Sequence, residues 1–171
     1  PTIMRGIYIG LGANLGDRAG NINRALNQLN APPFFKLLRV SSFYRSEPWG
    51  VKNQPWFLNA VAEIETPLQP HDLLAELKKI ERDLGRMPSD MLWGPRVIDL
   101  DIILYGEMVI NSPTLSIPHL NCLKRLFVLM PLVEMDETLV HPESGKLFRL
   151  YLEELEEHQA AGTCLRFNPT A

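Results

Sequence analysis

Hydrophobic residues in the first quarter of the chain switch between a strand-like and a helix-like spacing. Residues 4–11 form a short apolar run bounded by glycines, which predicts a buried strand. Asp17 is suited to cap a helix, and apolar residues recur after it at one-face spacing until a Pro-Pro pair ends the pattern at residues 32–33. Residues 35–44 mix aromatic and β-branched side chains and predict a second strand.

The middle of the chain continues with a loop, a strand, a helix, a second loop and another strand. Residues 46–56 contain two prolines and a glycine, so we expect a loop, and the alternating residues 57–65 predict a strand after it. Residues 70–84 carry apolar side chains at helical spacing and are followed by a glycine, which favours a helix end. The periodicity breaks over residues 86–96, and strong alternation resumes at residues 98–105, which predicts a further strand.

This order of elements is βαββαβ. It indicates an α+β fold with a ferredoxin-like core, in which helices pack on a mostly antiparallel sheet. Beyond the core, residues 123–135 and 147–158 are typical of added helices. The sequence shows no repeat, linker or low-complexity tract. We therefore expect a single domain over residues 1–171, with an irregular tail from about residue 160.

Composition and charge exclude several classes of protein. The 171 residues are 46% hydrophobic and 22% charged, as in an ordinary globular domain. The net charge of -3 argues against a nucleic-acid-binding protein but is compatible with a local basic cleft, and no apolar run is long enough for a membrane span. The first residues lack the pattern of a secretion signal, and Cys122 and Cys164 have no metal-ligand spacing. We expect a monomeric cytoplasmic protein with reduced thiols and with no nucleic-acid or membrane partner.

The segment WGPRVIDLDIILYG, residues 93–106, is the most informative for chemistry. In a strand, Asp99 and Asp101 share one face, whereas residues 98, 100, 102 and 104 form an apolar face on the other side. Two carboxylates on one strand face, about 6.6 Å apart at ~3.3 Å per residue, repel each other unless a cation lies near both. Mg²⁺ suits this position, because it binds one or two carboxylates and completes its shell with water and phosphate oxygens.

A bare Asp-x-Asp pattern is more often a solvated sheet face than a metal site. Here a Gly/Pro loop that contains Arg86 and Arg96 leads directly into the strand, and phosphate chemistry needs guanidinium groups as well as metal. Glu81, Arg86 and Trp93 also have ordinary interpretations, as an exposed helix residue, a cation near a helix end and a core aromatic. The pattern alone leaves the roles of these three residues open.

Gly10, Gly12 and Gly16 follow a predicted strand and precede a predicted helix, as in a dinucleotide-binding fingerprint. The last gap is one residue too long, however, and no acidic residue lies about 20 positions further on to bind a ribose. The phosphate-binding pattern Gly-Lys-Ser/Thr is missing as well. We interpret the glycines as part of a tight strand-to-helix turn.

Two further segments combine aromatic and polar side chains. Residues 41–60 form either a loop fixed by its own aromatic rings or a pocket in which rings stack on a planar heterocycle and Asn59 binds its edge. In residues 117–132, basic side chains such as Arg125 can meet phosphates, and Phe127 can supply a second stacking face. Taken singly, each of these residues is more often structural than functional.

Together, these segments closely resemble the 6-hydroxymethyl-7,8-dihydropterin pyrophosphokinases of folate biosynthesis. The matching motifs are GLGANLGDR, SSFYRSEPWG with QPWFLNA, WGPRVIDLDIILYG, and IPH with KRLF, over residues 8 to about 150. The resemblance implies a ferredoxin-like core with extra helices. It also implies transfer of pyrophosphate from ATP to the hydroxymethyl group of 6-hydroxymethyl-7,8-dihydropterin, with AMP as the leaving group.

The resemblance implies roles for individual residues. Asp99 and Asp101 match ligands of two Mg²⁺ ions that bridge the ATP phosphates, and Arg86 and Arg96 match catalytic-loop arginines. The nucleotide-binding residues that it implies are Glu81, Trp93, Arg96, Ile102, Ser116, His119 and Arg125. The pterin-binding residues that it implies are Ser46, Trp49, Phe57, Asn59 and Phe127.

The chain departs from the family pattern at several positions. Pro88 and Leu92 stand where some members have arginines, and Thr114 and Leu120 replace larger or polar nucleotide contacts. Phe57 stands where the family often has tyrosine, which keeps the stacking ring. These changes affect the expected contribution of the loop to ATP binding and leave the reaction class unchanged.

Two rival functions share the predicted topology. A palm-like nucleotidyltransferase also places carboxylates on a split-βαβ sheet, but it releases pyrophosphate and not AMP. A non-enzymatic RNA-binding sheet needs exposed stacking aromatics on its central strands, whereas residues 98–104 carry aspartates that repel phosphate when no metal is bound. Both rivals fit the sequence less well than the pterin pyrophosphokinase.

Overall fold

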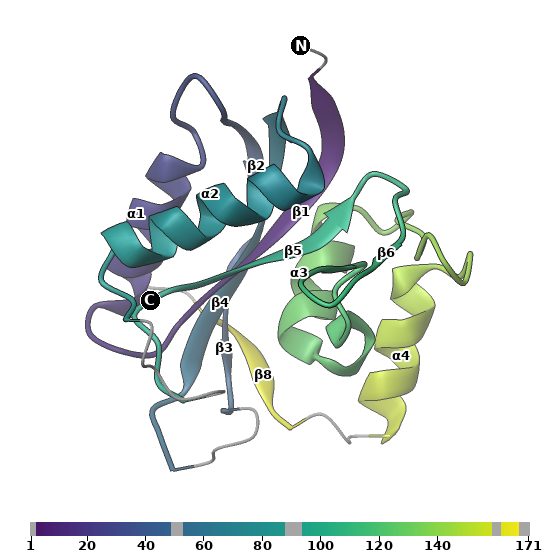
Figure 1. Ribbon diagram of the computed structural model, residues 1–171. Helices are drawn as coiled ribbons and strands as arrows, with labels where there is room; N and C mark the ends of the chain where they lie inside the picture. Colours follow the sequence, from purple (N-terminus) through teal and green to yellow (C-terminus); the bar gives the residue numbers. More distant parts are fainter. Residues whose placement is uncertain (1–2, 49–52, 88–93, 159–161, 168–171) are drawn as a thin grey trace.

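The computed structural model describes residues 3–48, 53–87, 94–158 and 162–167 (Figure 1). The described strands are β1 Met4–Ala13, β2 Lys36–Val40, β3 Phe43–Ser46, β4 Phe57–Thr66, β5 Asp99–Tyr105, β6 Ile110–Asn111, β7 Ser116–Ile117 and β8 Cys164–Phe167. The described helices are α1 Arg18–Gln28, α2 Pro70–Asp83, α3 Leu126–Met135 and α4 Phe148–His158, with a 3₁₀ turn at Cys122–Lys124. None of the helices in these ranges is long and apolar enough to span a membrane.

The main sheet is antiparallel, with the strand order β5-β1-β4-β3-β8, and β2 pairs with β4 beyond the end of β3. When β2 and β3 are counted as one interrupted strand, the elements from β1 to β5 follow the βαββαβ order, so the predicted ferredoxin-like α+β fold is confirmed. The register places Gly12 of β1 opposite Asn59 of β4 on one side and opposite Asp99 of β5 on the other. Three segments that lie far apart in the sequence therefore meet on adjacent strands.

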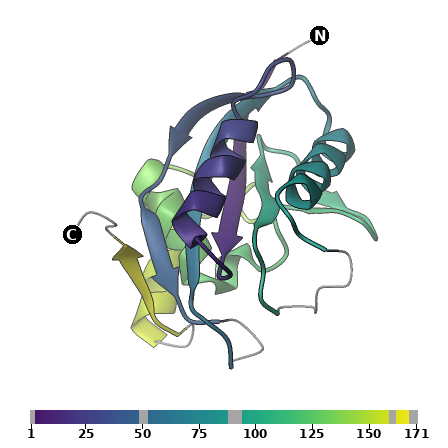
Figure 2. The ribbon, with the colours of Figure 1, turned by 90° about the vertical axis from the view of Figure 1, so that its left-hand side faces the viewer.

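Helices cover both faces of the sheet. Figure 2 shows α1 and α2 in front of the sheet and α3 and α4 behind it. Alternate residues of the central strands, such as Ile9, Ile64 and Leu100, are fully buried in the core under α1 and α2. A second core cluster, which includes Val61 and Leu132, lies on the α3 side. Because both faces bury apolar side chains, the strands between the two helical layers are held firmly in place.

The single strand expected at residues 35–44 is in fact two strands, β2 and β3. The interruption falls at Ser41 and Ser42, where a side chain enters the hydrogen-bonding pattern of the sheet. Ser41 Oγ accepts a hydrogen bond from the backbone N–H of Val61 at 2.9 Å, while Ser41 N–H donates to the Val61 carbonyl at 2.9 Å. Sequence periodicity does not predict this break, because aromatic and β-branched residues lie on both sides of the two serines.

The strict alternation expected for residues 98–104 fails at its end. Ile98, Leu100 and Ile102 belong to the core under α1 and α2, as predicted, but Leu104 belongs to the cluster on the α3 side. The register between β1 and β5 shifts after Ile102, which inserts one extra residue and reverses the faces that follow. The prediction that Leu104 shares the face of Ile98 was therefore wrong.

Two boundaries also differ from expectation. The first strand runs to Ala13, so Gly10 and Gly12 lie within β1 and only Gly16, with φ of +65°, lies in the turn before α1. The tail expected to be irregular from about residue 160 contains β8, which pairs with β3. A lone four-residue strand has no internal periodicity to reveal it. Its pairing partner lies more than a hundred residues earlier in the chain.

Candidate active site

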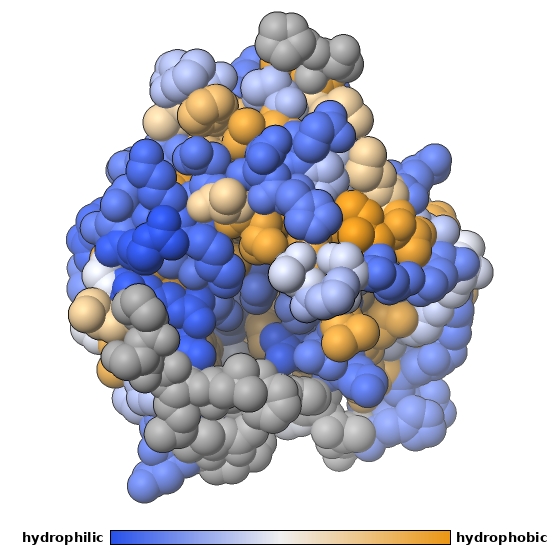
Figure 3. Space-filling model, in the orientation of Figure 1, coloured by the Kyte–Doolittle hydropathy of each residue, from blue (hydrophilic) through white to orange (hydrophobic). Residues whose placement is uncertain are grey.

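A cleft opens on the α3 side of the sheet, where β4, β1 and β5 lie next to one another. Its volume is about 270 Å³, and Figure 3 shows a hollow with hydrophilic side chains at its rim. Gly10 and Gly12 of β1 lie in its floor between the two flanking strands. A Cβ atom at Gly12 would lie 2.9 Å from Asn59 Oδ1, so the absence of a side chain keeps the floor open.

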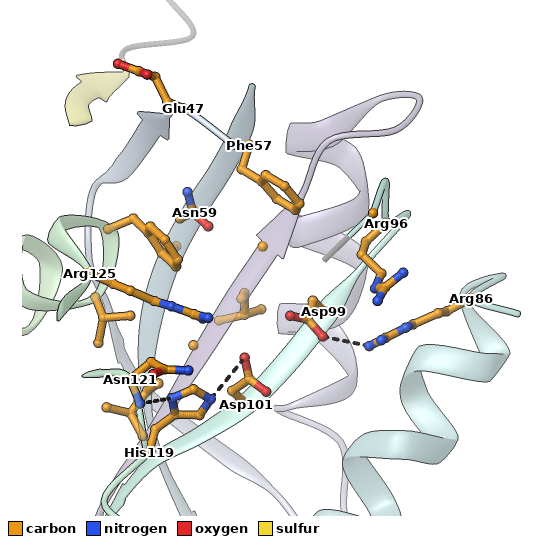
Figure 4. A pocket seen from close by; sticks show the side chains of 18 of the residues that line it. Glu47, Phe57, Asn59, Arg86, Arg96, Asp99, Asp101, His119, Asn121 and Arg125 are labelled. Carbon is orange, nitrogen blue, oxygen red and sulfur yellow. Dashed lines mark hydrogen bonds and ion pairs between the residues drawn. The ribbon is translucent and has the colours of Figure 1, made fainter. Parts of the chain in front are cut away.

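Asp99 and Asp101 project from β5 into the cleft (Figure 4). Their side chains are 35% and 34% exposed, which leaves each carboxylate accessible to a ligand. Burial of the surrounding site and the nearby charge of Asp99 together raise the pKa of Asp101 to about 8. The cleft therefore disfavours the negative charge of Asp101 unless a cation binds beside it.

Arg86 joins Asp99 to a carboxylate buried behind the cleft. One guanidinium nitrogen, Nη1, donates to Asp99 Oδ1 at 2.6 Å and to Glu81 Oε2 at 2.8 Å. Glu81 is 2% exposed, and its Oε2 also accepts a hydrogen bond from the Leu100 N–H at 2.8 Å. The chain turns at Gly85, with φ of +106°, so that the Arg86 N–H donates to the Glu81 carbonyl. Burial lowers the pKa of Arg86, but the adjacent Asp99 and Glu81 carboxylates outweigh it and raise the pKa.

Two more arginines line the cleft. Arg96 is only 6% exposed, and its Nη1 atom has no hydrogen-bond partner among the described residues. A buried donor without a partner is costly, so this geometry suits an anionic ligand. Arg125 lies over the ring of Phe127, with its guanidinium carbon 5.5 Å from the ring centre. Burial lowers the pKa of Arg125, against the opposing effects of Asp101 and Asp99.

His119 lies beside Asp101 at the other side of the cleft from Arg86 (Figure 4). Burial, followed by the nearby charge of Arg125, lowers the pKa of His119 to about 4. The ring is therefore neutral at pH 7. Its Nδ1 accepts a hydrogen bond from the Asn121 N–H at 3.2 Å, which leaves the proton on Nε2. That atom lies 3.9 Å from Asp101 Oδ2, so His119 presents a neutral N–H donor to the acidic side of the cleft.

The opposite end of the cleft is aromatic. Phe57 of β4 and Phe127 of α3 both line it, together with Asn59. The Asn59 Nδ2 atom donates to Ser46 Oγ at 2.7 Å, and both residues are 3% exposed. Because the amide nitrogen is bound behind the wall, the carbonyl oxygen lies toward Gly12 and the cleft. This end can hold a flat ring and accept a hydrogen bond from its edge.

A family model described as 7,8-dihydro-6-hydroxymethylpterin-pyrophosphokinase (HPPK) matches residues 8–137. The chain belongs to the HPPK family. All the residues that line the cleft, from Gly10 to Val128, fall within the matched range. The site described above is therefore part of the region that defines the family.

Several curated relatives are similar to the chain over most of its length. A 2-amino-4-hydroxy-6-hydroxymethyldihydropteridine pyrophosphokinase of Aquifex aeolicus is 38% identical over 164 residues, which cover 96% of this chain and 96% of the relative. The protein of the same name from Haemophilus influenzae is 40% identical over 162 residues, covering 95% and 98%. The folic acid synthesis protein fol1 of Pneumocystis carinii is 44% identical over 152 residues, and the chain spans only 20% of that larger protein.

Solved structures show the same fold in larger proteins. An HPPK-DHPS crystal structure in complex with substrates superposes with a TM-score of 0.75 at 13% identity, covering 96% of this chain and 47% of that chain. A wild-type Plasmodium falciparum HPPK-DHPS structure with pteroate gives a TM-score of 0.72 at 16% identity and 43% coverage of that chain. The chain thus spans a little under half of these proteins, and at such low identity the likeness concerns the fold alone.

The HPPK fold brings most of the expected site residues into one cleft. The residues implied by the resemblance that line it are Phe57, Asn59, Arg86, Arg96, Asp99, Asp101, His119, Arg125 and Phe127. They come from β4, β5, α3 and the segments beside them, on one side of the sheet. Trp49 and Trp93 lie outside the described residues, as do Pro88 and Leu92.

Four other expected residues do not line the cleft. The Ile102 side chain lies in the core on the opposite face of the sheet, because strand residues alternate. Glu81 and Ser46 are buried behind the wall, where they bind Arg86 and Asn59. Ser116 lies on β7 and is partly exposed. None of these four side chains is part of the lining of the cleft.

Some residues that line the cleft were not predicted from the sequence. Gly10 and Gly12 were assigned to a turn, although their alternation with Ile9 and Leu11 is a signal that they share the other face of a strand. Lys78 and Asn121 also line the cleft. Lys78 lies one helical turn before Arg82 on α2, and in sequence its charge looks like that of any solvated helix residue.

Proposed function

We propose that the chain transfers pyrophosphate from ATP to the hydroxymethyl group of 6-hydroxymethyl-7,8-dihydropterin and releases AMP. Membership of the HPPK family gives the enzyme class, a pyrophosphokinase of folate biosynthesis. The cleft supports an assignment of its two ends: phosphates at the Arg86/Asp99 end and the pterin at the Phe57/Asn59 end. The reacting hydroxyl then lies between them, where Gly10 and Gly12 of β1 lie in the floor.

We further propose that Asp99 and Asp101 hold Mg²⁺ when ATP is bound. The two carboxylates share one strand face and are accessible from the cleft. No group of three or more potential metal-ligating side chains occurs among the described residues. Two carboxylates nevertheless suffice for Mg²⁺, because phosphate oxygens and water complete its octahedral shell. The bound ions would neutralise phosphate charge and increase the acidity of the pterin hydroxyl.

The arginines provide positioning and electrostatic stabilisation. Arg96 lines the cleft and has a buried donor, Nη1, that has no partner among the described residues, and Arg86 holds a guanidinium beside Asp99. In an in-line attack on the β-phosphorus, negative charge moves across the phosphoryl oxygens toward the leaving AMP. Fixed cations that meet this charge lower the barrier without reorganising during the reaction. His119 adds a neutral Nε2–H donor, which can bind a phosphate oxygen without needing an acidic pH.

The pterin end determines which acceptor reacts. Two phenyl rings, from Phe57 and Phe127, supply apolar faces for a planar bicycle, and the Asn59 carbonyl oxygen accepts from an N–H on its edge. Ser46 acts through Asn59 by binding its amide nitrogen. A substrate without an N–H group on its ring edge would leave the Asn59 oxygen without a hydrogen bond, which costs about 1–3 kcal/mol in a buried site.

The observation that carries the proposal is the placement of the Asp99/Asp101 pair between the arginines of the cleft and an aromatic pocket, in one cleft of an HPPK-family chain. The test is to mix the protein with Mg-ATP and 6-hydroxymethyl-7,8-dihydropterin and to identify the nucleotide product. We expect AMP, formed only when both metal and pterin are present. Formation of ADP would indicate transfer of a single phosphoryl group, and release of pyrophosphate would indicate nucleotidyl transfer. Either result would contradict the proposal.

A further inference from the structure

A buried asparagine connects three loops around the cleft. Asn14 follows directly after β1 and is 3% exposed. Its Oδ1 atom accepts a hydrogen bond from the backbone N–H of Arg96 at 2.8 Å. Its Nδ2 atom donates to Gln54 Oε1 at 2.8 Å and to the Pro55 carbonyl at 2.9 Å. All three bonds join segments that lie 40 or more residues away in the sequence.

The bonds to Arg96 fix the backbone of that residue on both sides. The Asn14 side chain binds the Arg96 N–H, and the backbone N–H groups of Asn14 and Leu15 donate to the Arg96 carbonyl at 3.0 and 3.2 Å. By contrast, the Arg96 Nη1 atom has no partner among the described residues. These bonds therefore hold the backbone of Arg96, while its guanidinium lines the cleft and can bind a ligand.

The other bonds of Asn14 reach the pterin end. Gln54 and Pro55 lie just before Phe57, the first residue of β4 and part of the aromatic wall. Between them and Phe57, the Trp56 carbonyl accepts a hydrogen bond from Arg18 Nη1 at 2.9 Å. The entry to β4 is thus attached to the turn between β1 and α1. A shift of Asn14 would change the position of both the arginine and the aromatic wall.

We propose that Asn14 is a positioning residue, which holds Arg96 at the phosphate end and couples it to the loop that leads into Phe57. This inference rests on the proposed function, because it gives Asn14 its effect through the phosphate-binding role of Arg96. Asn14 does not line the cleft. Its contribution to kcat through Arg96 should therefore disappear when the Arg96 guanidinium is removed, whereas a purely structural contribution would persist.

The test is a double-mutant cycle with Asn14→Ala, Arg96→Ala and the combined variant, assayed for AMP formation. Asn14→Ala alone should lower kcat by about tenfold to a hundredfold, since a misplacement of about 1 Å can have an effect of this size. In the Arg96→Ala background, Asn14→Ala should lower kcat by less than about threefold. If the two losses simply multiplied, Asn14 would act independently of Arg96 and the proposal would be wrong.

A matched control is Asn21→Ala. Asn21 is 5% exposed, and its Nδ2 donates to the Leu15 carbonyl in the same turn, but it forms no bond to Arg96. Both variants should lose similar stability, and only Asn14→Ala should lose kcat beyond what its stability explains. Equal kcat losses in the two variants would contradict the proposal. If Asn14→Ala did not fold, Asn14→Ser would replace it in the cycle, because its hydroxyl is too short to reach both loops but keeps the site polar.

Hydrogen exchange provides a readout that does not depend on activity. The Arg96 amide proton should exchange faster in Asn14→Ala than in the parent protein or in Asn21→Ala, because its acceptor has been removed. Unchanged exchange would show that Asn14 does not hold Arg96. If the parent protein formed no AMP, the proposed function would fail, and the exchange result would still decide whether Asn14 positions Arg96.

Discussion

At the scale of single residues, the cleft combines groups that the proposed function needs and that folding alone would disfavour. Asp101 is placed near the like charges of Asp99 and Glu81, and its pKa is raised to about 8, first by burial and then by Asp99. Asp99, in contrast, has an ion pair with Arg86 at 2.6 Å. The two aspartates share a strand face and a proposed metal, but only one of them has a close cationic partner among the described residues. Their neutral variants should therefore differ in stability.

The first prediction concerns Asp101→Asn. We expect it to abolish Mg²⁺-dependent AMP formation and to raise the melting temperature of the metal-free protein. Because the folded-state pKa of Asp101 is higher than its ordinary value of 3.8, wild-type stability falls as pH rises from about 4 to about 8. The stability advantage of the variant should therefore be small near pH 4 and largest near pH 8. Thermal unfolding at several pH values, without metal, measures it.

The matched control is Asp99→Asn. It should also abolish turnover, but it should not stabilise the protein, because it breaks the ion pair with Arg86. Near-normal Mg²⁺-dependent turnover in either variant would exclude that aspartate as a required metal ligand. A melting temperature of Asp101→Asn below that of the parent at pH 8 would contradict the electrostatic argument.

The second prediction concerns the floor of the pterin end. In Gly12→Ala the new Cβ would lie 2.9 Å from Asn59 Oδ1 and 3.7 Å from Phe57 Cδ1. The Asn59 amide is already bound to Ser46, so it cannot move away freely. We expect the Kd for pterin to rise by about tenfold, which corresponds to ~1.4 kcal/mol. The Kd for a non-hydrolysable ATP analogue should hardly change.

Gly10→Ala is the comparison variant on the same strand. Its Cβ would meet the flexible end of Ile103, with Cδ1 at 3.1 Å, and it lies nearer the phosphate end opposite Asp101. It should therefore affect pterin binding less than Gly12→Ala does. Titrations of both variants with each ligand measure the difference. Equal pterin affinities of Gly12→Ala and the parent would show that the pterin does not approach this part of the floor.

The sequence predicted individual residues best where an alternating strand pattern placed charged side chains together on one face. The alternation in residues 98–102 correctly predicts that Asp99 and Asp101 face away from the core. The same alternation in β1 places Gly10 and Gly12 on the cleft face, but the glycines suggested a turn. Glu81 and Ser46 show a different limit: their partners, Arg86 and Asn59, are defined by contacts in space, and the sequence does not reveal which polar residues end up behind the wall.

At the scale of elements, one helix residue fastens α3 to the interrupted edge of the sheet. Glu134 accepts hydrogen bonds from the N–H and the hydroxyl of Ser42, at 3.0 and 2.6 Å, and from the hydroxyl of Tyr44 at 2.8 Å. Arg166 of β8 lies 3.7 Å away. The break between β2 and β3 thus exposes polar groups that α3 satisfies. The sequence could not predict this arrangement, because it depends on residues about 90 positions apart.

The third prediction is that Glu134→Gln destabilises the protein at pH 7 by about 1–2 kcal/mol, through the loss of charge-assisted hydrogen bonds. Burial raises the pKa of Glu134, but the hydrogen bonds from Ser42 and Tyr44 outweigh it, and the pKa lies below its ordinary value of 4.5. The stabilisation by the carboxylate is therefore present above about pH 4.5 and is lost as pH falls through the lower folded-state pKa.

Urea unfolding at pH 7 and again in acid measures this contribution. The difference between the parent and Glu134→Gln should shrink as the pH falls below 4.5. Glu154→Gln is a suitable control, because Glu154 is 57% exposed and its ion pair with Lys146 should contribute less than about 1 kcal/mol. A stability difference for Glu134→Gln that is independent of pH would show that the carboxylate charge does not stabilise the contact between α3 and the sheet.

At the scale of the whole molecule, the described chain closes on itself at the aromatic end of the cleft, where we propose that the pterin binds. The family match ends at residue 137, yet β8 returns at residues 164–167 to pair with β3, with Cys164 opposite Ser46. Glu47, which lines the cleft, donates its N–H to the Thr163 carbonyl and accepts from the Thr163 N–H at 3.0 Å. The ferredoxin-like core was predictable from local periodicity. The pairing of β8 with β3 was not predictable from local periodicity, because only the folded chain brings these two strands together.

The last prediction follows from that closure. A chain that ends at His158 lacks β8 and so leaves the edge of β3 unpaired beside Ser46, which binds Asn59. We expect its KM for pterin to rise about fivefold, equivalent to ~1 kcal/mol, while KM for ATP changes little, since the phosphate end lies on β5 and α2. Arg166→Ala should have little effect on pterin KM, because it removes an exposed side chain and keeps the strand pairing. Steady-state kinetics with each substrate varied in turn distinguish the two variants. A truncated chain that kept its pterin KM would mean that β3 alone holds Ser46 and Asn59 in place, whereas an equal rise in both KM values would indicate a general loss of structure.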